Sequence, residues 1–289
     1  FKVPLIEESY KFDRNLYADN GKTKENHVLP DNPRSNFLYQ EFMTGPHQVR
    51  QVWVPSFDYK SSSNYWNLVS KQVLDKIPYS CNEKGHLEVL DILRKTMTEE
   101  PVKSFDLKGC GLQFPREYII ILIDIIDRMT LGHLTKEGDR AKHLLDSIKV
   151  DGYNNNSFIP KRGVGLGYFT GLMSLASFIM MDNEDIVAAF ADDVLIKRDS
   201  FDECVRNIES YGMVVNAEKT GKEYHNNVFF MNCGFLVKED EIYYFDLDNA
   251  PLASLTTCRY HFQRKEVISI LPWSEMDPLV AAYQCELLY

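Results

Sequence analysis

Two adjacent aspartates, Asp192 and Asp193, lie between two short apolar runs in the stretch AAFADDVLIK, residues 188–197. Apolar runs joined by a few turn-prone residues predict a β-hairpin, here over 186–196, with the carboxylates at its tip. Neighbouring carboxylates repel each other unless they are solvated, protonated or bound to a cation. A bare Asp-Asp pair is most often a solvated turn, so the chemistry of this tip depends on what else the chain brings to it.

A third carboxylate, Asp106, lies in the stretch SFDL at 104–107, at the end of an expected apolar-flanked strand and just before a glycine-containing turn. Three carboxylates from two adjacent strands can hold two Mg²⁺ or Mn²⁺ ions about 3.5–4 Å apart, which activate a hydroxyl and stabilise a leaving phosphate oxygen. We therefore expect Asp106, Asp192 and Asp193 to be catalytic metal ligands for nucleotidyl transfer. The carboxylates of Asp106 and Asp192 should then lie within about 4–7 Å of each other.

The stretch KRGVGLGYFTG at 161–171 lies between the two acidic segments. Dense glycines let backbone approach a ligand closely, and the Thr170 hydroxyl can bind a sugar or a base. Gly165, Gly167 and Thr170 are therefore candidate substrate-binding residues. A glycine-rich loop alone is a weak signal, and its position between the acidic strands gives it weight.

The order of these segments resembles motifs A to E in the palm of template-directed RNA polymerases and reverse transcriptases. The motifs, in chain order, are SFDL, GVGLGYFT, FADD, GMVVNAEKT and VFFMNCGFLV, within a resemblance that covers about 45–245. More narrowly, DLKGCGLQFP at 106–115 resembles the DLSxATDRFP type of motif A in narnavirus-, mitovirus- and levivirus-like RNA-dependent RNA polymerases. GVGLGYFTGLMSL is similar to the GxGYT-type motif B of that group.

The resemblance implies an RNA-dependent RNA polymerase that adds ribonucleotides to an RNA 3′ end during viral genome replication. Lys219 would be the general acid that protonates the leaving pyrophosphate, because a Lys beside a metal-bound triphosphate is suitably placed for proton transfer. Arg50, in the candidate motif F QVRQVWVP at 48–55, would meet the incoming triphosphate. The implied partners are an RNA template, the nascent RNA strand and nucleoside triphosphates.

Two positions depart from the family pattern. The Asp expected late in motif A is absent, because Gly111, Leu112 and Gln113 stand there, so the ribose 2′-hydroxyl must be recognised through Gln113 or Thr170. Cys110 and Gly111 are small, so they leave room for that hydroxyl, which favours ribonucleotides. The glycine that usually precedes the motif C aspartates is Ala191, which is small enough for a tight hairpin.

The expected fold class is α+β, a polymerase palm with an antiparallel sheet backed by helices, partial fingers and a partial thumb. Residues 1–100 would form the fingers portion, 101–247 the palm with a fingers-type insertion at 131–160, and 248–289 the start of a thumb or a C-terminal extension. The chain is expected to be a fragment, with another viral chain as a candidate to complete the fingers or thumb.

Several elements must position these motifs. Apolar periodicity predicts helices over 67–78, 85–97, 116–131, 171–181 and about 200–211. A strand should precede Asp106, and a second hairpin over 228–247 should turn near Glu239–Asp240. Residues 151–160 are polar and predict a loop, and Asp124 and Asp127 on the 116–131 helix are expected to be structural.

Composition limits the partners and the compartment. The net charge of −10 argues against binding of nucleic acid by bulk positive charge, so such binding must be local. Six cysteines without a C-x-x-C pair indicate neither a zinc site nor a disulfide framework. No apolar run reaches the roughly 20 residues of a membrane span. The protein is expected to act in a reducing compartment, the host cytoplasm or mitochondrion, and it is not expected to be secreted.

Two alternatives remain open. A reverse transcriptase also carries FADD-like, motif D and motif E segments, but it typically has an aromatic steric gate where this chain has Cys110 and Gly111, and a PQG-type motif B that is absent here. A catalytically inactive palm that serves as an RNA-binding subunit would explain the missing motif A Asp. Retention of the three aspartates and Lys219 argues against it.

Overall fold

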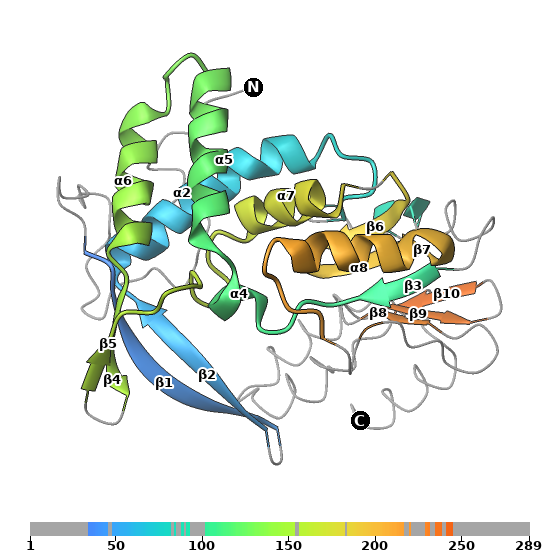
Figure 1. Ribbon diagram of the computed structural model, residues 1–289, viewed down its shortest axis with the longest axis horizontal. Helices are drawn as coiled ribbons and strands as arrows, with labels where there is room; N and C mark the ends of the chain where they lie inside the picture. The colour runs from blue at the N-terminus through green and yellow to red at the C-terminus, as the bar shows by residue number, and fades with distance from the viewer. Residues whose placement is uncertain are drawn as a thin grey trace, which may run out of the picture. The chain divides into compact units, whose positions relative to one another are not determined.

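The computed structural model describes residues 34–45, 48–81, 84, 88–89, 91–92, 102–153, 156–182, 184–216, 220, 229–231, 235–238 and 241–244. These residues form antiparallel and mixed sheets backed by helices, which is an α+β arrangement (Figure 1). The chain divides into two compact units: unit 1 is 1–77, 107–182 and 204–214, and unit 2 is 78–106, 183–203 and 215–289. The predicted division into fingers, palm and thumb is a different partition, which these units do not test.

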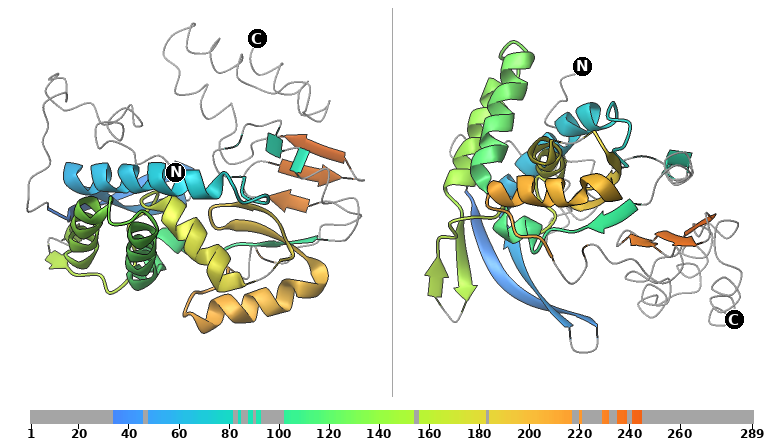
Figure 2. Two further views of the ribbon diagram at one scale, coloured as in Figure 1. Left: turned by 90° about the horizontal axis from the view of Figure 1, so that it is seen from above. Right: turned by 45° about the vertical axis from the view of Figure 1, so that its right-hand side comes forward.

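The sheet of unit 1 has the strand order β2-β1-β4-β5. β1 (Asn36–Gly45) and β2 (Gln48–Pro55) form an antiparallel hairpin, and β1 also pairs in parallel with β4 (Lys149–Tyr153). Figure 2 shows β1 and β2 as a long twisted ribbon with β4 and β5 beside it. The sequence indicated neither strand of the ribbon, because its aromatic and basic residues do not alternate regularly.

The prediction of a loop over 151–160 was wrong in part. β4 extends into this stretch up to Tyr153 and pairs antiparallel with β5 (Asn156–Phe158). Val150 is fully buried and pairs with Phe37 on one side and Phe158 on the other. Pairing with β1 thus recruits a polar, Asn-rich segment into the sheet, and such tertiary pairing overrides the turn signal of its composition.

Unit 1 also contains the helices α2 (Phe57–Leu74), α5 (Arg116–Met129), α6 (Thr135–Asp146) and α7 (Thr170–Met181). α2 packs against α6 and α7, and α5 packs against the same two helices (Figure 2). α5 and α7 agree with the predictions for 116–131 and 171–181. α2 begins well before the predicted residue 67, capped by the Ser56 hydroxyl, and it ends before Pro78 as predicted.

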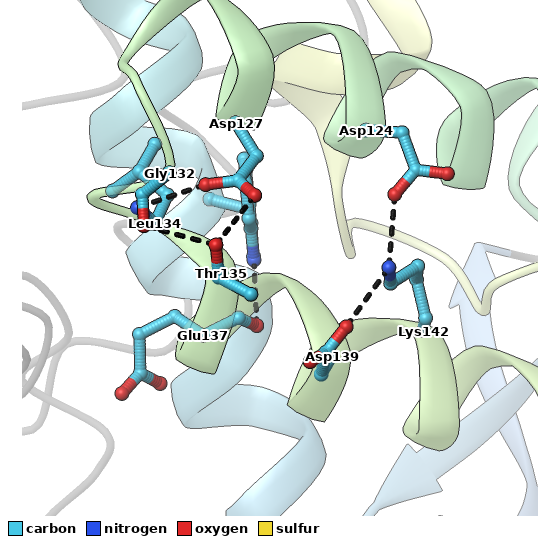
Figure 3. Close-up of polar contacts among 9 residues, drawn as sticks. Asp124, Asp127, Gly132, Leu134, Thr135, Glu137, Asp139 and Lys142 are labelled. Carbon is cyan, nitrogen blue, oxygen red and sulfur yellow. Dashed lines mark hydrogen bonds and ion pairs between the residues drawn. The ribbon is translucent and has the colours of Figure 1, made fainter.

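Asp124 and Asp127 hold the α5–α6 pair together (Figure 3). Asp127 accepts hydrogen bonds from the Leu134 amide at 2.9 Å and the Thr135 hydroxyl at 2.8 Å, where α6 begins. Asp124 accepts one from Lys142 at 2.9 Å, and this bond raises the pKa of Lys142. These contacts agree with the structural role expected for both aspartates.

Unit 2 contains two three-stranded sheets. The first has the order β3-β7-β6, from β3 (Val102–Phe105), β7 (Asp193–Lys197) and β6 (Ile186–Phe190). The second has the order β10-β9-β8, from β8 (Phe229–Met231), β9 (Phe235–Lys238) and β10 (Glu241–Tyr244). Lys238 pairs with Glu241, which agrees with the predicted reversal near 239–240, two residues outside the described part. β8 contacts β3 and β7.

The remaining predicted elements are partly described. After the 3₁₀ turn Arg198–Ser200, α8 (Phe201–Ser210) agrees with the helix predicted over about 200–211. Of the helix predicted over 85–97, residues 88, 89, 91 and 92 are described and are helical. The predicted thumb segment, 248–289, lies outside the described residues. Among the described helices, none combines the length and apolar character needed to cross a membrane.

Candidate functional site

The FADD stretch forms the tip of an antiparallel hairpin, as predicted. β6 and β7 pair up to Phe190 and Asp193, so that Ala191 and Asp192 connect the strands. Ala191 adopts a left-handed backbone conformation with φ of 50°. This conformation disfavours residues with a Cβ, so the chain tolerates at Ala191 a strain that a glycine would relieve.

Asp106 follows β3 directly beside this tip. β3 pairs antiparallel with β7, and the last pair in the ladder joins Phe105 to Val194. One further step in the same register would bring Asp106 opposite Asp193, and opposed residues in antiparallel strands have Cα atoms about 4.5–5.5 Å apart. The sheet therefore brings together the ends of the two segments that carry the three predicted aspartates.

Asp106 is held by a segment of the predicted motif D. Its carboxylate Oδ2 accepts a hydrogen bond from the side-chain Nδ2 of Asn216 at 2.7 Å. Its backbone carbonyl accepts one from the backbone amide of Asn216 at 2.9 Å. Its own amide donates to Thr220 Oγ1 at 3.2 Å, and Thr220 N donates to the Asn216 carbonyl at 2.9 Å. Asp106 is only 7% exposed, and a buried carboxylate needs such donors. Asn216 and Thr220 thus fix its position.

Sequence reasoning missed Asn216 and Thr220. Both residues lie within NAEKT, part of the segment that resembles motif D, in which only Lys219 was predicted to have a role. The signal was a pair of small hydrogen-bonding residues four positions apart, which is the spacing of one helical turn. Lys219 itself lies outside the described residues.

Residues 79–81 cover the outer edge of β6. The Cys81 amide donates to the Ala189 carbonyl at 2.8 Å, and the Ala189 amide donates to the Tyr79 carbonyl at 2.9 Å. Burial raises the pKa of the Cys81 thiol to about 11. Cys81, Cys110 and Cys204 are buried, and none of these three takes part in a disulfide bond.

The far end of the hairpin is fixed by Asp185. Its carboxylate accepts a short hydrogen bond from the Ser200 hydroxyl and lies 3.3 Å from Lys197 Nζ. The hydrogen bond from Ser200 is the main reason that the pKa of Asp185 lies below its ordinary value, and the nearby Lys197 ammonium lowers this pKa further. These contacts set the start of β6 against the end of β7.

The glycine-rich loop belongs to unit 1 and is attached to α2. The buried Tyr59 hydroxyl donates to the Val164 carbonyl at 2.8 Å, and burial raises the pKa of Tyr59 well above its ordinary value, so the phenol remains a donor. The Phe169 amide donates to Ser63 Oγ at 2.8 Å. At the start of α7, Asn67 Oδ1 accepts from the Gly171 amide at 3.1 Å and from Thr170 Oγ1 at 3.5 Å.

The same loop packs closely on α4 (Cys110–Gln113). The Val164 and Gly165 amides donate to the Gly111 carbonyl at 2.8 and 2.9 Å. A Cβ on Gly111 would lie 2.7 Å from the Gly165 carbonyl oxygen, and one on Gly163 would lie 2.3 Å from the Leu112 carbonyl oxygen. Close packing against the loop therefore explains why residue 111 is a glycine. The space that we expected it to leave for a ribose would be a second reason.

The other predicted substrate-binding residues lie in different parts of unit 1. Gln113 is exposed at the end of α4, and Gly167 faces open space, with nothing within 4 Å of an added Cβ. Arg50 lies in β2 opposite Phe42, and its side chain is outside the described part. Their roles toward a triphosphate or a sugar remain predictions.

Within the part of the chain that the structure describes, no group of three or more His, Cys, Asp or Glu side chains is arranged as a metal site. The metal-binding role of the three aspartates and the expected 4–7 Å between the carboxylates of Asp106 and Asp192 therefore remain predictions.

No protein-family model matches this chain, and no curated protein matches it.

Proposed function

We propose that this chain carries the catalytic palm of an RNA-dependent RNA polymerase of a narnavirus-, mitovirus- or levivirus-like virus. In this proposal, it adds ribonucleotides to an RNA 3′ end by two-metal nucleotidyl transfer. Asp106, Asp192 and Asp193 are the metal ligands and Lys219 is the general acid.

One observation carries the proposal. β3 pairs with β7 up to Phe105 and Val194, and the same register continued by one residue would set Asp106 opposite Asp193, next to the tip of the hairpin. Two-metal sites need carboxylates that arrive from separate strands at one point, and the pairing of β3 with β7, two segments far apart in the sequence, supports such an arrangement. The five motifs in order add to it.

The donor set fits a hard divalent cation. Carboxylate oxygens are the ligands that Mg²⁺ and Mn²⁺ prefer, and no described Cys or His is part of the set. When bound, two such ions would supply activation of the primer 3′-hydroxyl and charge neutralisation on the leaving pyrophosphate. The contribution of the protein is positional: Asn216 orients the Asp106 carboxylate, and the tight turn at Ala191 brings Asp192 and Asp193 to the end of the sheet.

The glycine-rich loop would provide the substrate contacts in this proposal. Gly165 and Gly167 would let the template or the incoming nucleotide approach the backbone, Arg50 would meet the triphosphate, and Thr170 or Gln113 would read the ribose. The partners would be an RNA template, the nascent strand and nucleoside triphosphates. Another viral chain could complete the fingers or thumb, and the site of action would be the host cytoplasm or mitochondrion.

Primer extension tests the proposal. Purified protein is given a primed RNA template with Mg²⁺ or Mn²⁺, and rNTPs and dNTPs in separate reactions. We expect extension with rNTPs, and its loss in the Asp193→Asn variant, which removes a metal-binding charge while keeping nearly the same volume. Asp199→Asn is the matched control, because Asp199 is exposed in the turn after β7, and this variant should keep wild-type activity.

Each alternative has its own outcome. Extension with dNTPs in preference to rNTPs would favour the reverse transcriptase. If the folded protein binds the primed template but extends nothing with either metal, it is the inactive palm-like subunit.

A further inference from the structure

Unit 1 contains a pocket of about 510 Å³ on one face of its sheet. It is lined by Tyr39, Gln51, Trp53, Leu112, Asn156, Ser157 and Phe158. Its volume lies within the range of about 300–1,000 Å³ that is usual for small-molecule sites.

The sheet register explains why these residues meet. Tyr39 pairs with Trp53 across the β1–β2 hairpin, and Phe158 pairs with Val150, which in turn pairs with Phe37. Residues two apart along a strand share a face, so Gln51 lies on the face of Trp53 and Asn156 on that of Phe158. Strands from both hairpins thus contribute aromatic and carboxamide side chains to one face.

The aromatic wall is rigid. The ring of Trp53 makes edge-to-face contacts with Phe37 at 6.1 Å and with Phe158 at 6.0 Å, and Trp53 is only 7% exposed. The Tyr39 hydroxyl donates to Glu41 Oε1 at 2.6 Å, which restrains the Tyr39 ring. A preorganised wall loses little conformational entropy when a flat ligand packs on it.

The chemistry of the lining selects a flat, uncharged heterocycle. Gln51 and Asn156 each have a carboxamide, which can offer a donor and an acceptor side by side, and this is how such side chains read the edge of a nucleobase. None of the described lining residues is charged, so the pocket offers no direct partner for a phosphate. Aromatic faces next to carboxamides are the means by which proteins hold unstacked bases of single-stranded RNA.

We propose that this pocket binds one unpaired nucleobase, which packs against Tyr39 and Phe158 and hydrogen-bonds with Gln51 or Asn156. The base could come from single-stranded RNA or from a free nucleotide. A base in a duplex is excluded, because its faces and its pairing edge are already engaged. This inference stands apart from the polymerase proposal, because it concerns binding alone and uses none of the aspartates.

Fluorescence anisotropy with a short labelled single-stranded RNA, at one fixed salt concentration, tests the inference. Tyr39→Leu removes an aromatic ring and should weaken binding about 5- to 150-fold, the range found when one base–aromatic stack is lost. Gln51→Leu should reduce the affinity difference between adenine-rich and uracil-rich strands. Gln40→Leu is the matched control, since Gln40 lies on the opposite face of β1, and it should bind like the wild type. Circular dichroism and unfolding midpoints check that all variants fold.

Competition distinguishes the two sources of the base. Displacement of the RNA by adenosine monophosphate, lost in Tyr39→Leu, means that the pocket accepts free nucleotides. Tyr39-dependent RNA binding without such displacement means that it accepts only a base within a strand. The inference is overturned if no single-stranded RNA binds, if Tyr39→Leu binds like the wild type, if Gln40→Leu weakens binding equally, or if duplex RNA binds as tightly as the single strand.

Discussion

Asn216 holds Asp106 at two points. Its side-chain Nδ2 donates a 2.7 Å hydrogen bond to the Asp106 carboxylate, and its backbone amide donates a 2.9 Å hydrogen bond to the Asp106 backbone carbonyl. The two residues are separated by 110 positions in the chain. The contact therefore ties the segment after α8 to the end of β3. In the proposed polymerase it would set the direction of a metal-binding carboxylate.

Asn216→Ala should destabilise the protein. The buried Asp106 carboxylate loses its amide donor, and an unsatisfied buried group costs about 1–3 kcal/mol of unfolding free energy. Urea unfolding of the wild type and the variant measures the difference.

A double-mutant cycle with Asp106→Ala isolates this contact. We expect a coupling energy of about 1 kcal/mol or more, because either single substitution already removes the hydrogen bond. If the two effects add to within about 0.5 kcal/mol, the side-chain contact does not stabilise the fold.

Gly163→Ala should be more destabilising than Gly167→Ala. Both glycines have positive φ, 87° and 80°, so the backbone strain of an added Cβ is similar in the two variants. Only at Gly163 would the Cβ also meet backbone, the Leu112 carbonyl oxygen at 2.3 Å. Overpacking costs about 1–3 kcal/mol, and this should be the difference in unfolding free energy between the variants. Equal losses would mean that the loop moves away from α4 without cost.

Elements with a strong local signal could be predicted from the sequence. α5 and α7 have long apolar segments, and the β6–β7 hairpin has apolar runs on both sides of a short polar tip. α6, β4 and β5 were missed as elements, because 131–158 is polar and Gly- and Asn-containing, and its structure depends on contacts with Trp66 on α2 and with β1. The first half of α2, rich in Ser, was missed for the same reason: its three buried serines, Ser61, Ser62 and Ser63, give no apolar period.

The candidate site follows the same rule. Spacing and flanks pointed to Asp106, Asp192 and Asp193, and the sheet register is consistent with their proximity. The residues that hold the site, Asn216 for Asp106 and Ser63 and Asn67 for the glycine-rich loop, act across more than 100 positions of sequence. A single sequence carries no direct signal of such pairs.

Alkaline pH should destabilise the wild type more than Cys81→Ala. The pKa of Cys81 is raised to about 11 in the folded state, while an unfolded Cys titrates near 8.5. Between these values the unfolded state has released the proton and the folded state has not, so stability falls as pH rises. The buried, protonated Cys81 thiol contributes its full stabilisation of the folded state below about pH 8.5. At pH 10 the wild type should have lost about 2 kcal/mol of unfolding free energy through this group.

Urea unfolding at a series of pH values measures this loss. The difference in unfolding free energy between the wild type and Cys81→Ala should narrow as the pH rises from 8 to 10, because other groups titrate alike in both proteins. A constant difference would mean that Cys81 is not shielded from solvent in the folded state.

Thr170→Val should lower the use of ribonucleotides more than that of deoxyribonucleotides, if the chain is the proposed polymerase. Thr170 is the first residue of α7, with its hydroxyl 3.5 Å from Asn67 Oδ1 at the end of the glycine-rich loop. Valine keeps the shape and removes the hydroxyl, so a ribose 2′-hydroxyl would lose a partner worth about 1–3 kcal/mol, or roughly ten- to a hundredfold in discrimination. The ratio of kcat/KM for ATP to that for dATP on an RNA template measures this effect.

Thr170→Ser keeps the hydroxyl and should preserve the ratio. An unchanged ratio in Thr170→Val would leave Gln113 as the candidate for ribose recognition, because no other residue was predicted to read the 2′-hydroxyl.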